Sequence, residues 1–155
     1  MTQEELLRLP KVELHCHLDG SLSQEFIEKR LGRSVKKEEL SVSDDCTSLA
    51  EYLEKFDMPC QCLKDEEGLE EAGYDVLKSM SREHVCYAEI RFAPQLSVNG
   101  GLTQDEVVEA AIHGAERGMK AYPEIRVGLI LCCMRGADNE ALNMQTVETA
   151  KKYLG

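Results

Sequence analysis

The chain has 155 residues, of which 43% are apolar and 30% are charged, and this is the composition of one globular domain with a proper core. Acids outnumber bases by 29 to 18, which gives a formal net charge of -11. Nucleic acids and anionic membranes would repel such a chain, so we expect neither as a partner. The start of the sequence has no signal peptide and no apolar run approaches a membrane span, which predicts a cytoplasmic protein.

The first predicted elements are a short helix and a strand. The capping-box pattern that begins at Thr2 predicts a helix to about Arg8, and Pro10 ends it. Residues 11–18 alternate strictly between polar and apolar side chains, which indicates a β-strand. The alternation predicts one face with Glu13, His15, His17 and Asp19, and an opposite face with Val12, Leu14, Cys16 and Leu18.

Helices are expected next. A capping box at Ser21 predicts a helix that stops at Gly32, and the polar residues 33–46 predict a loop. A further capping box at Ser48 opens a helix that ends at Pro59. Residues 64–82 form another helical pattern. The helix after Ser48 has one apolar face, which consists of Leu49, Tyr52, Leu53 and Phe56.

The last third alternates between strand and helix. Residues 84–92 predict a strand, a helix capped by Thr103 follows, and the apolar run 125–134 predicts a strand buried on both faces. A final helix starts at Asp138 or Asn139, with Gly155 at its C′ position. The pattern predicts an α/β fold with a parallel sheet. Three strand–helix units are too few for a closed eight-stranded barrel, so we expect part of a larger structure.

The spacing of His15 and His17 is the strongest chemical signal. On a strand, residues two apart point to one face and their rings can converge on one Zn²⁺, although Cu, Fe or Ni would also accept imidazole. The alternative is one packed histidine and one that faces a crevice. Asp19 is a candidate metal ligand, general base or substrate acceptor, or a helix cap. Glu13 is a candidate brace for a histidine or a partner in an ion pair.

Other candidates have weaker patterns. His84 and His113 have no useful spacing to the histidine pair, and we interpret both as structural. Arg91 and Arg135 lie near the ends of predicted strands, where ligands bind in parallel α/β proteins, but buried ion pairs explain them equally well. The seven cysteines predict reduced thiols, and C-x-C at residues 60–62 has no second pair to complete a metal site.

Taken together, three motifs resemble the adenosine deaminase family. They are "PKVELHCHLDGSL" (10–22), "YAEIRFAPQL" (87–96) with "GLTQDEVVEA" (101–110), and "LILCCMRG" (129–136). The resemblance covers nearly the whole chain. It implies a metal-dependent (β/α)₈ TIM barrel, of which residues 1–155 would be the first three βα units and the N-terminal part of a single domain. It also implies hydrolysis of adenosine, and of 2′-deoxyadenosine, to inosine and ammonia in purine metabolism.

The resemblance assigns roles to particular residues. It implies that His15 and His17 are two ligands of one Zn²⁺, that His17 also lies against the nucleoside, and that Asp19 hydrogen-bonds the ribose 5′-hydroxyl. Residues 48–58 resemble a helix that covers the substrate, and its apolar wall consists of Leu49, Tyr52, Leu53 and Phe56. Core packing is the alternative for those four.

The remaining catalytic residues of that family are expected on later strands, so this chain contains none of them. We therefore expect residues 1–155 alone to be inactive and to bind zinc weakly. Two alternatives stay open. One is an adenine deaminase or an N6-modified adenosine nucleotide deaminase of the same family. The other is a non-catalytic half-barrel that self-associates through its open sheet edges.

Overall fold

The computed structural model describes residues 1–154, and the expected C′ role of Gly155 lies outside them. The chain folds as an α/β structure with three parallel strands in the order β1-β2-β3. The elements are α1 (Gln3–Arg8), β1 (Lys11–His17), α2 (Gln24–Leu31), α3 (Lys37–Leu40), α4 (Leu49–Glu54), α5 (Asp57–Gln61), α6 (Glu66–Arg82), β2 (Val85–Phe92), α7 (Gln104–Ala121), β3 (Arg126–Leu131) and α8 (Glu140–Lys152). Short 3₁₀ turns cover Pro94–Leu96, Val98–Gly100 and Ala137–Asn139.

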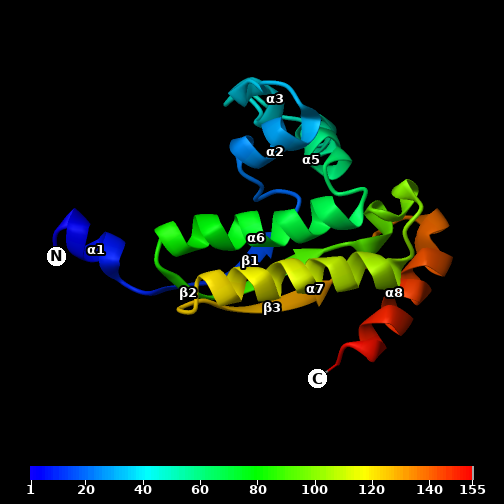
Figure 1. Ribbon diagram of the computed structural model, residues 1–155. Helices are drawn as coiled ribbons and strands as arrows, with labels where there is room; N and C mark the ends of the chain where they lie inside the picture. The colour runs from blue at the N-terminus through cyan, green and yellow to red at the C-terminus, as the bar shows by residue number, and fades with distance from the viewer. Residues whose placement is uncertain (155) are drawn as a thin grey trace.

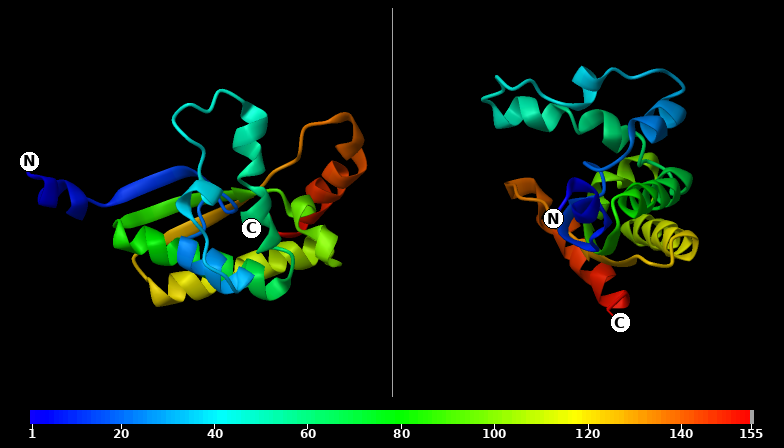
Figure 2. Two further views of the ribbon diagram at one scale, coloured as in Figure 1. Left: turned by 90° about the horizontal axis from the view of Figure 1, so that it is seen from above. Right: turned by 90° about the vertical axis from the view of Figure 1, so that its left-hand side faces the viewer.

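Two long helices cover one face of the sheet. The helices α6 and α7 lie side by side on that face, whereas α2 to α5 form a separate group above this body (Figures 1 and 2). Side chains of β2 that point to the helices are fully buried, as Ala88 and Ile90 show at 0% and 1% exposure. Tyr87, on the opposite face, is 37% exposed. The core therefore lies between the sheet and its two covering helices.

Most predicted boundaries agree with the structure. The capping boxes at Thr2 and Thr103 are present, and Gly32 ends α2 with a φ of 65°. Two details differ. The cap of α2 is Ser23 rather than Ser21, because its hydroxyl accepts from the backbone N–H of Phe26. The expected loop 33–46 contains the short helix α3, which has a polar surface and therefore no apolar period to predict it.

The helix after Ser48 does not end at Pro59, which corrects that prediction. It ends at Glu54, and a new helix, α5, begins at Asp57 and contains Pro59 as its third residue. Backbone N–H groups in a first helical turn have no partner within the helix, so proline is tolerated there. Residues 48–58 therefore contain the whole of α4 and the start of a second short helix, α5.

The strict alternation of β1 is also not maintained. Its register against β2 shifts between Lys11 and Val12 and again between Glu13 and Cys16. Val12 therefore pairs with Tyr87 on the open face, whereas Glu13 pairs with Ala88 on the helix-covered face. A bulge adds one residue to a strand and exchanges the faces of the residues on either side of it. The prediction that Glu13 shares a face with His17 is thus wrong.

β3 is less buried than its sequence predicts. All of its residues after Arg126 are only partly buried. A strand is buried on both faces only when helices cover both faces and neighbouring strands flank it. In the described part of the chain, β3 is an edge strand, so its apolar side chains stay half-exposed.

Candidate active site

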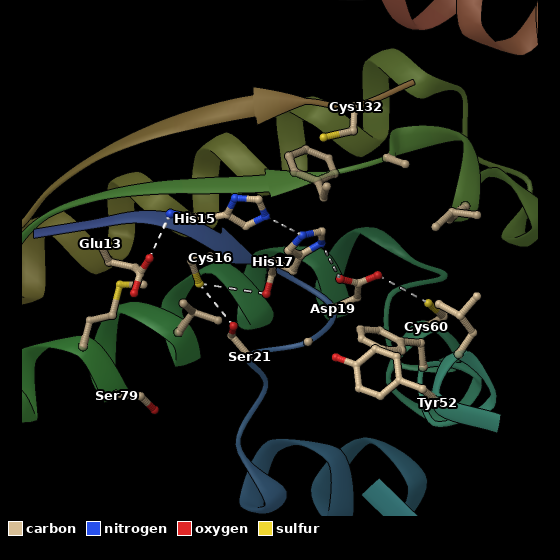
Figure 3. Close-up of a pocket in the computed structure, with 18 of the residues that line it drawn as sticks. Glu13, His15, Cys16, His17, Asp19, Ser21, Tyr52, Cys60, Ser79 and Cys132 are labelled. Carbon is tan, nitrogen blue, oxygen red and sulfur yellow. Dashed lines mark hydrogen bonds and ion pairs between the residues drawn. The ribbon is translucent and has the colours of Figure 1, made fainter. Parts of the chain in front are cut away.

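The two histidines converge at the carboxyl end of β1. Their Nε2 atoms lie 3.2 Å apart and their ring centroids 5.2 Å apart. His17 pairs with Arg91 of β2, so both residues lie on the open face of the sheet. His15 lies within the irregular stretch between Glu13 and Cys16, yet its ring still reaches the ring of His17. The rings point away from α6 and into a large cavity (Figure 3).

Glu13 supports the histidines through the backbone. Its carboxylate accepts a hydrogen bond of 2.8 Å from the backbone N–H of His15. The side chain itself points toward α6, where it lies with Ser79 on the wall of the same cavity (Figure 3). Glu13 therefore braces the bulge that carries His15, and its hydrogen bond goes to the backbone rather than to either imidazole ring.

Asp19 follows in the turn after β1. One carboxylate oxygen lies 4.0 Å from Nδ1 of His17, and the other lies 4.0 Å from the thiol of Cys60 (Figure 3). Burial raises the pKa of the Asp19 carboxyl, and the His17 ring opposes this shift. Its Oδ1 has no hydrogen-bond partner among the described residues. A half-buried carboxylate with a free acceptor atom is suited to receive a hydroxyl group.

A buried aspartate fixes the loop that carries Asp19. Asp75 on α6 is 8% exposed, and it accepts hydrogen bonds of 2.8 Å from both the backbone N–H and the hydroxyl of Ser23. Because Ser23 also caps α2, one carboxylate holds the end of the β1–α2 loop. The sequence signal was an acid beside the apolar stripe of a helix, and sequence reasoning did not use it.

The opposite wall comes from α4 and α5. Tyr52, Leu53 and Phe56 line the cavity, and the rings of Tyr52 and Phe56 pack edge to face at 5.4 Å. Gly20 allows this approach, since a side chain there would lie 3.1 Å from the Phe56 ring. Leu49 is not among the lining residues and is 72% exposed. The structure therefore brings three of the four predicted wall residues to the site.

Cys60 extends this wall and was not predicted. It lines the cavity four residues beyond Phe56, so it continues the stripe of Tyr52 and Phe56 at helical spacing. The sequence analysis missed this spacing because it expected the helix to end at Pro59. Burial, with the nearby Asp19 and Asp57 carboxylates, raises the pKa of the Cys60 thiol to about 11. Cys60 is thus a neutral group near neutral pH and contributes shape rather than nucleophilicity.

The cavity has a volume of about 930 Å³, which is enough for a ligand of nucleoside size or larger. Arg91 lies beside His17, and its Nε is buried without a hydrogen-bond partner among the described residues. Arg135 is exposed beyond β3, and His84 and His113 are exposed as well. Residues 1–154 bring together no group of three or more metal-binding side chains. The same part of the chain has no helix long and apolar enough to cross a membrane.

Comparisons with solved structures agree with this fold. A zinc-bound amidohydrolase from Burkholderia ambifaria superposes with a TM-score of 0.76 at 20% identity, over 100% of this chain and 44% of that one. The N6-mAMP deaminase of Arabidopsis superposes with a TM-score of 0.73 at 26% identity, over 97% and 48%. Structural neighbours of this kind are TIM barrels, of which this chain matches about half.

Sequence relatives give the family. The adenosine deaminase of Haemophilus ducreyi is 38% identical over 92% of this chain and 44% of its own length. That of Clostridium perfringens strain SM101 is 39% identical over 97% and 48%. The chain thus spans about half the length of these relatives. The family model described as adenosine deaminase matches residues 10–154, and the chain belongs to the adenosine deaminase family.

Proposed function

We propose that residues 1–155 form the N-terminal part of a single metal-dependent barrel that hydrolyses adenosine, and 2′-deoxyadenosine, to inosine and ammonia. The observation that carries this proposal is the convergence of His15 and His17, whose Nε2 atoms lie 3.2 Å apart at the carboxyl end of a strand. In TIM-barrel enzymes, catalytic groups occupy this end of the strands.

The donor pair fits zinc. Two tetrahedral ligands at roughly 2.0–2.1 Å from one Zn²⁺ lie about 3.3 Å from each other, close to the observed separation. His15 and His17 would hold the ion together with ligands from the rest of the barrel. When bound, the ion supplies Lewis acidity, which lowers the pKa of water toward neutrality.

The other residues of the site would bind the nucleoside and exclude bulk water. Asp19 would accept a hydrogen bond from a ribose hydroxyl through its unpartnered Oδ1. The apolar wall of Tyr52, Leu53 and Phe56 would cover the purine and keep bulk water away. Residues 48–58 would act as the lid, since α4 has no buried residue and can move without breaking the core.

Asp19 favours a nucleoside over a nucleotide. A carboxylate beside the ribose pocket would repel a 5′-phosphate, because two like charges at close range in a partly desolvated site destabilise each other. The competing substrate class is an N6-modified adenosine nucleotide or free adenine. The Arabidopsis relative named for N6-mAMP is the reason to test a nucleotide directly.

The test is an assay of residues 1–155 joined to the part of the Clostridium perfringens adenosine deaminase that this chain does not cover. We expect zinc-dependent release of ammonia, with kcat/KM for adenosine at least about 100-fold above that for AMP. That ratio corresponds to about 2.7 kcal/mol. His17→Ala should abolish turnover, and the matched change His113→Ala, at an exposed helix position, should leave it unchanged. A preference for AMP or adenine would contradict the proposed substrate.

A further inference from the structure

Among residues 1–154, the thiol of Cys60 is the side-chain donor that lies within reach of Oδ2 of Asp19. Its Sγ lies 4.0 Å from that oxygen, and Figure 3 shows the contact at the wall of the cavity. Burial first, and nearby carboxylates second, raise the pKa of the Cys60 thiol to about 11, so near neutral pH the sulfur keeps its proton and is a donor. The other oxygen of Asp19, Oδ1, has no hydrogen-bond partner in the same part of the chain.

Cys60 belongs to the anchored part of the helices that cover the site. On α5, Pro59 is buried, and just beyond it Cys62 and Leu63 are 1% and 4% exposed and belong to the hydrophobic core. The backbone N–H of Cys60 also donates a hydrogen bond of 2.9 Å to the carbonyl of Phe56. α4, in contrast, has no buried residue. Because a displacement of α5 would expose apolar core surface, Cys60 keeps its place beside the site while α4 is free to move.

The orientation of the Asp19 carboxylate decides which oxygen a ligand meets. The torsion about the Cβ–Cγ bond of aspartate is broad, so a carboxylate whose oxygens have no partner samples many orientations. A donor at Oδ2 restricts this rotation and leaves Oδ1 as the acceptor that faces a ligand. A group that is oriented before binding loses less conformational freedom when the ligand arrives, which strengthens binding.

We propose that Cys60 is a positioning residue, whose thiol holds the Asp19 carboxylate in the orientation that accepts the ribose 5′-hydroxyl of a nucleoside. This inference rests on the proposed function and adds a specificity determinant to the same site. Cys60 acts through Asp19 and touches no reacting atom, so it lowers KM and leaves kcat nearly unchanged. A substrate without the 5′-hydroxyl gains nothing from the thiol.

Simple packing is the competing role for Cys60, since this residue continues the wall formed by Tyr52 and Phe56. A packing residue contacts carbon atoms of the nucleoside, so its removal would weaken every nucleoside alike. A positioning residue affects only the substrate that carries the hydroxyl. Comparing the effect of one substitution on two substrates that differ in this hydroxyl therefore separates the two roles, by the logic of a double-mutant cycle.

The experiment uses the joined chain described above, with adenosine and 5′-deoxyadenosine as substrates. We expect Cys60→Ala to raise KM for adenosine about three- to tenfold, the range of one weak hydrogen bond, and to change kcat by less than about twofold. KM for 5′-deoxyadenosine should stay unchanged, and Cys60→Ser, which keeps a donor, should restore most of the loss. The matched control is Cys133→Ala, which should change neither KM, because Cys133 is exposed and does not line the cavity.

A second measurement needs no turnover. The infrared S–H stretching band shifts to lower frequency when a thiol donates a hydrogen bond, and the difference between spectra with and without Cys60→Ala isolates the band of Cys60. Asp19→Asn should move this band to higher frequency, because a neutral amide oxygen is a weaker acceptor than a carboxylate.

Three results would overturn the proposal: equal changes in KM for both substrates, no change in KM for adenosine, or an S–H band that does not respond to Asp19→Asn. A responsive band in a joined chain without turnover would contradict the proposed function and support the positioning of Asp19 by Cys60.

Discussion

At the scale of single residues, the backbone at His84 is the clearest departure from unstrained geometry. His84 has a φ of 59°, and it is the only non-glycine residue of the described chain with a positive φ. It joins α6 to β2, and its carbonyl accepts a hydrogen bond of 2.9 Å from the backbone N–H of Lys11. The short connection between α6 and β2 therefore contains one residue in the left-handed conformation.

We predict that His84→Gly stabilises the chain. Removing the left-handed penalty of about 1–2 kcal/mol outweighs the extra entropy of glycine in the unfolded state, about 0.5–1 kcal/mol. The net gain should be ~0.5–1 kcal/mol in the free energy of unfolding, measured by urea denaturation. The control is His113→Gly, an exposed position inside α7, which should cost about 0.5 kcal/mol, because glycine has a lower helix propensity than histidine. A loss of stability at both positions would show that the His84 side chain itself matters.

Individual residues also show the limits of sequence reasoning. The convergence of His15 and His17 was predictable from their spacing of two residues on a strand, and it is kept although the register shift between Glu13 and Cys16 includes His15. The face of Glu13 was not predictable, since one extra residue in the ladder moves it to the helix side. Alternation gives side-chain direction only within an unbroken register.

At the scale of elements, the contact between α6 and α7 dominates the fold. Glycines allow these helices to approach closely: a methyl group at Gly114 would overlap with the carbonyl oxygen of Glu70, and one at Gly73 would lie 3.0 Å from the backbone of Gly114 and Ala115. An amphipathic pattern does not reveal such positions, because glycine belongs to neither the apolar nor the polar face of a helix. The pattern therefore predicted both helices but not how closely they pack.

We predict that Gly114→Ala destabilises the chain by about 1–3 kcal/mol, because the two helices must move apart and strain the packed core. The change opposes helix propensity, which alone would favour alanine by about 1 kcal/mol. Gly128→Ala on β3 is the control, since its nearest neighbour is the Tyr87 hydroxyl at 3.6 Å, and it should alter stability by less than about 0.5 kcal/mol. Equal effects at both sites would refute close helix packing as the cause.

At the scale of the whole molecule, the order of strands and helices was predictable and the shape of the site was not. The parallel sheet followed from alternating strand and helix patterns. The shape of the cavity depends on how α4 and α5 lie over the carboxyl end of β1. No local sequence pattern predicts this arrangement. Pro59 illustrates the point: a residue that ends helices in general here lies in the first turn of a new one. A new helix begins at Asp57, and this start decides the position of Pro59 within it.

We predict that residues 1–155 alone do not deaminate adenosine and bind zinc weakly. The described residues contribute two convergent histidines and no third metal-binding group, whereas a catalytic zinc site needs three protein ligands and an open position. Zinc affinity is measured by competition with a chelator, and turnover by the change in purine absorbance. His15→Ala should remove the residual binding, and His84→Ala, at an exposed turn, should not. Turnover by a preparation of verified mass, abolished by chelators, would contradict this prediction.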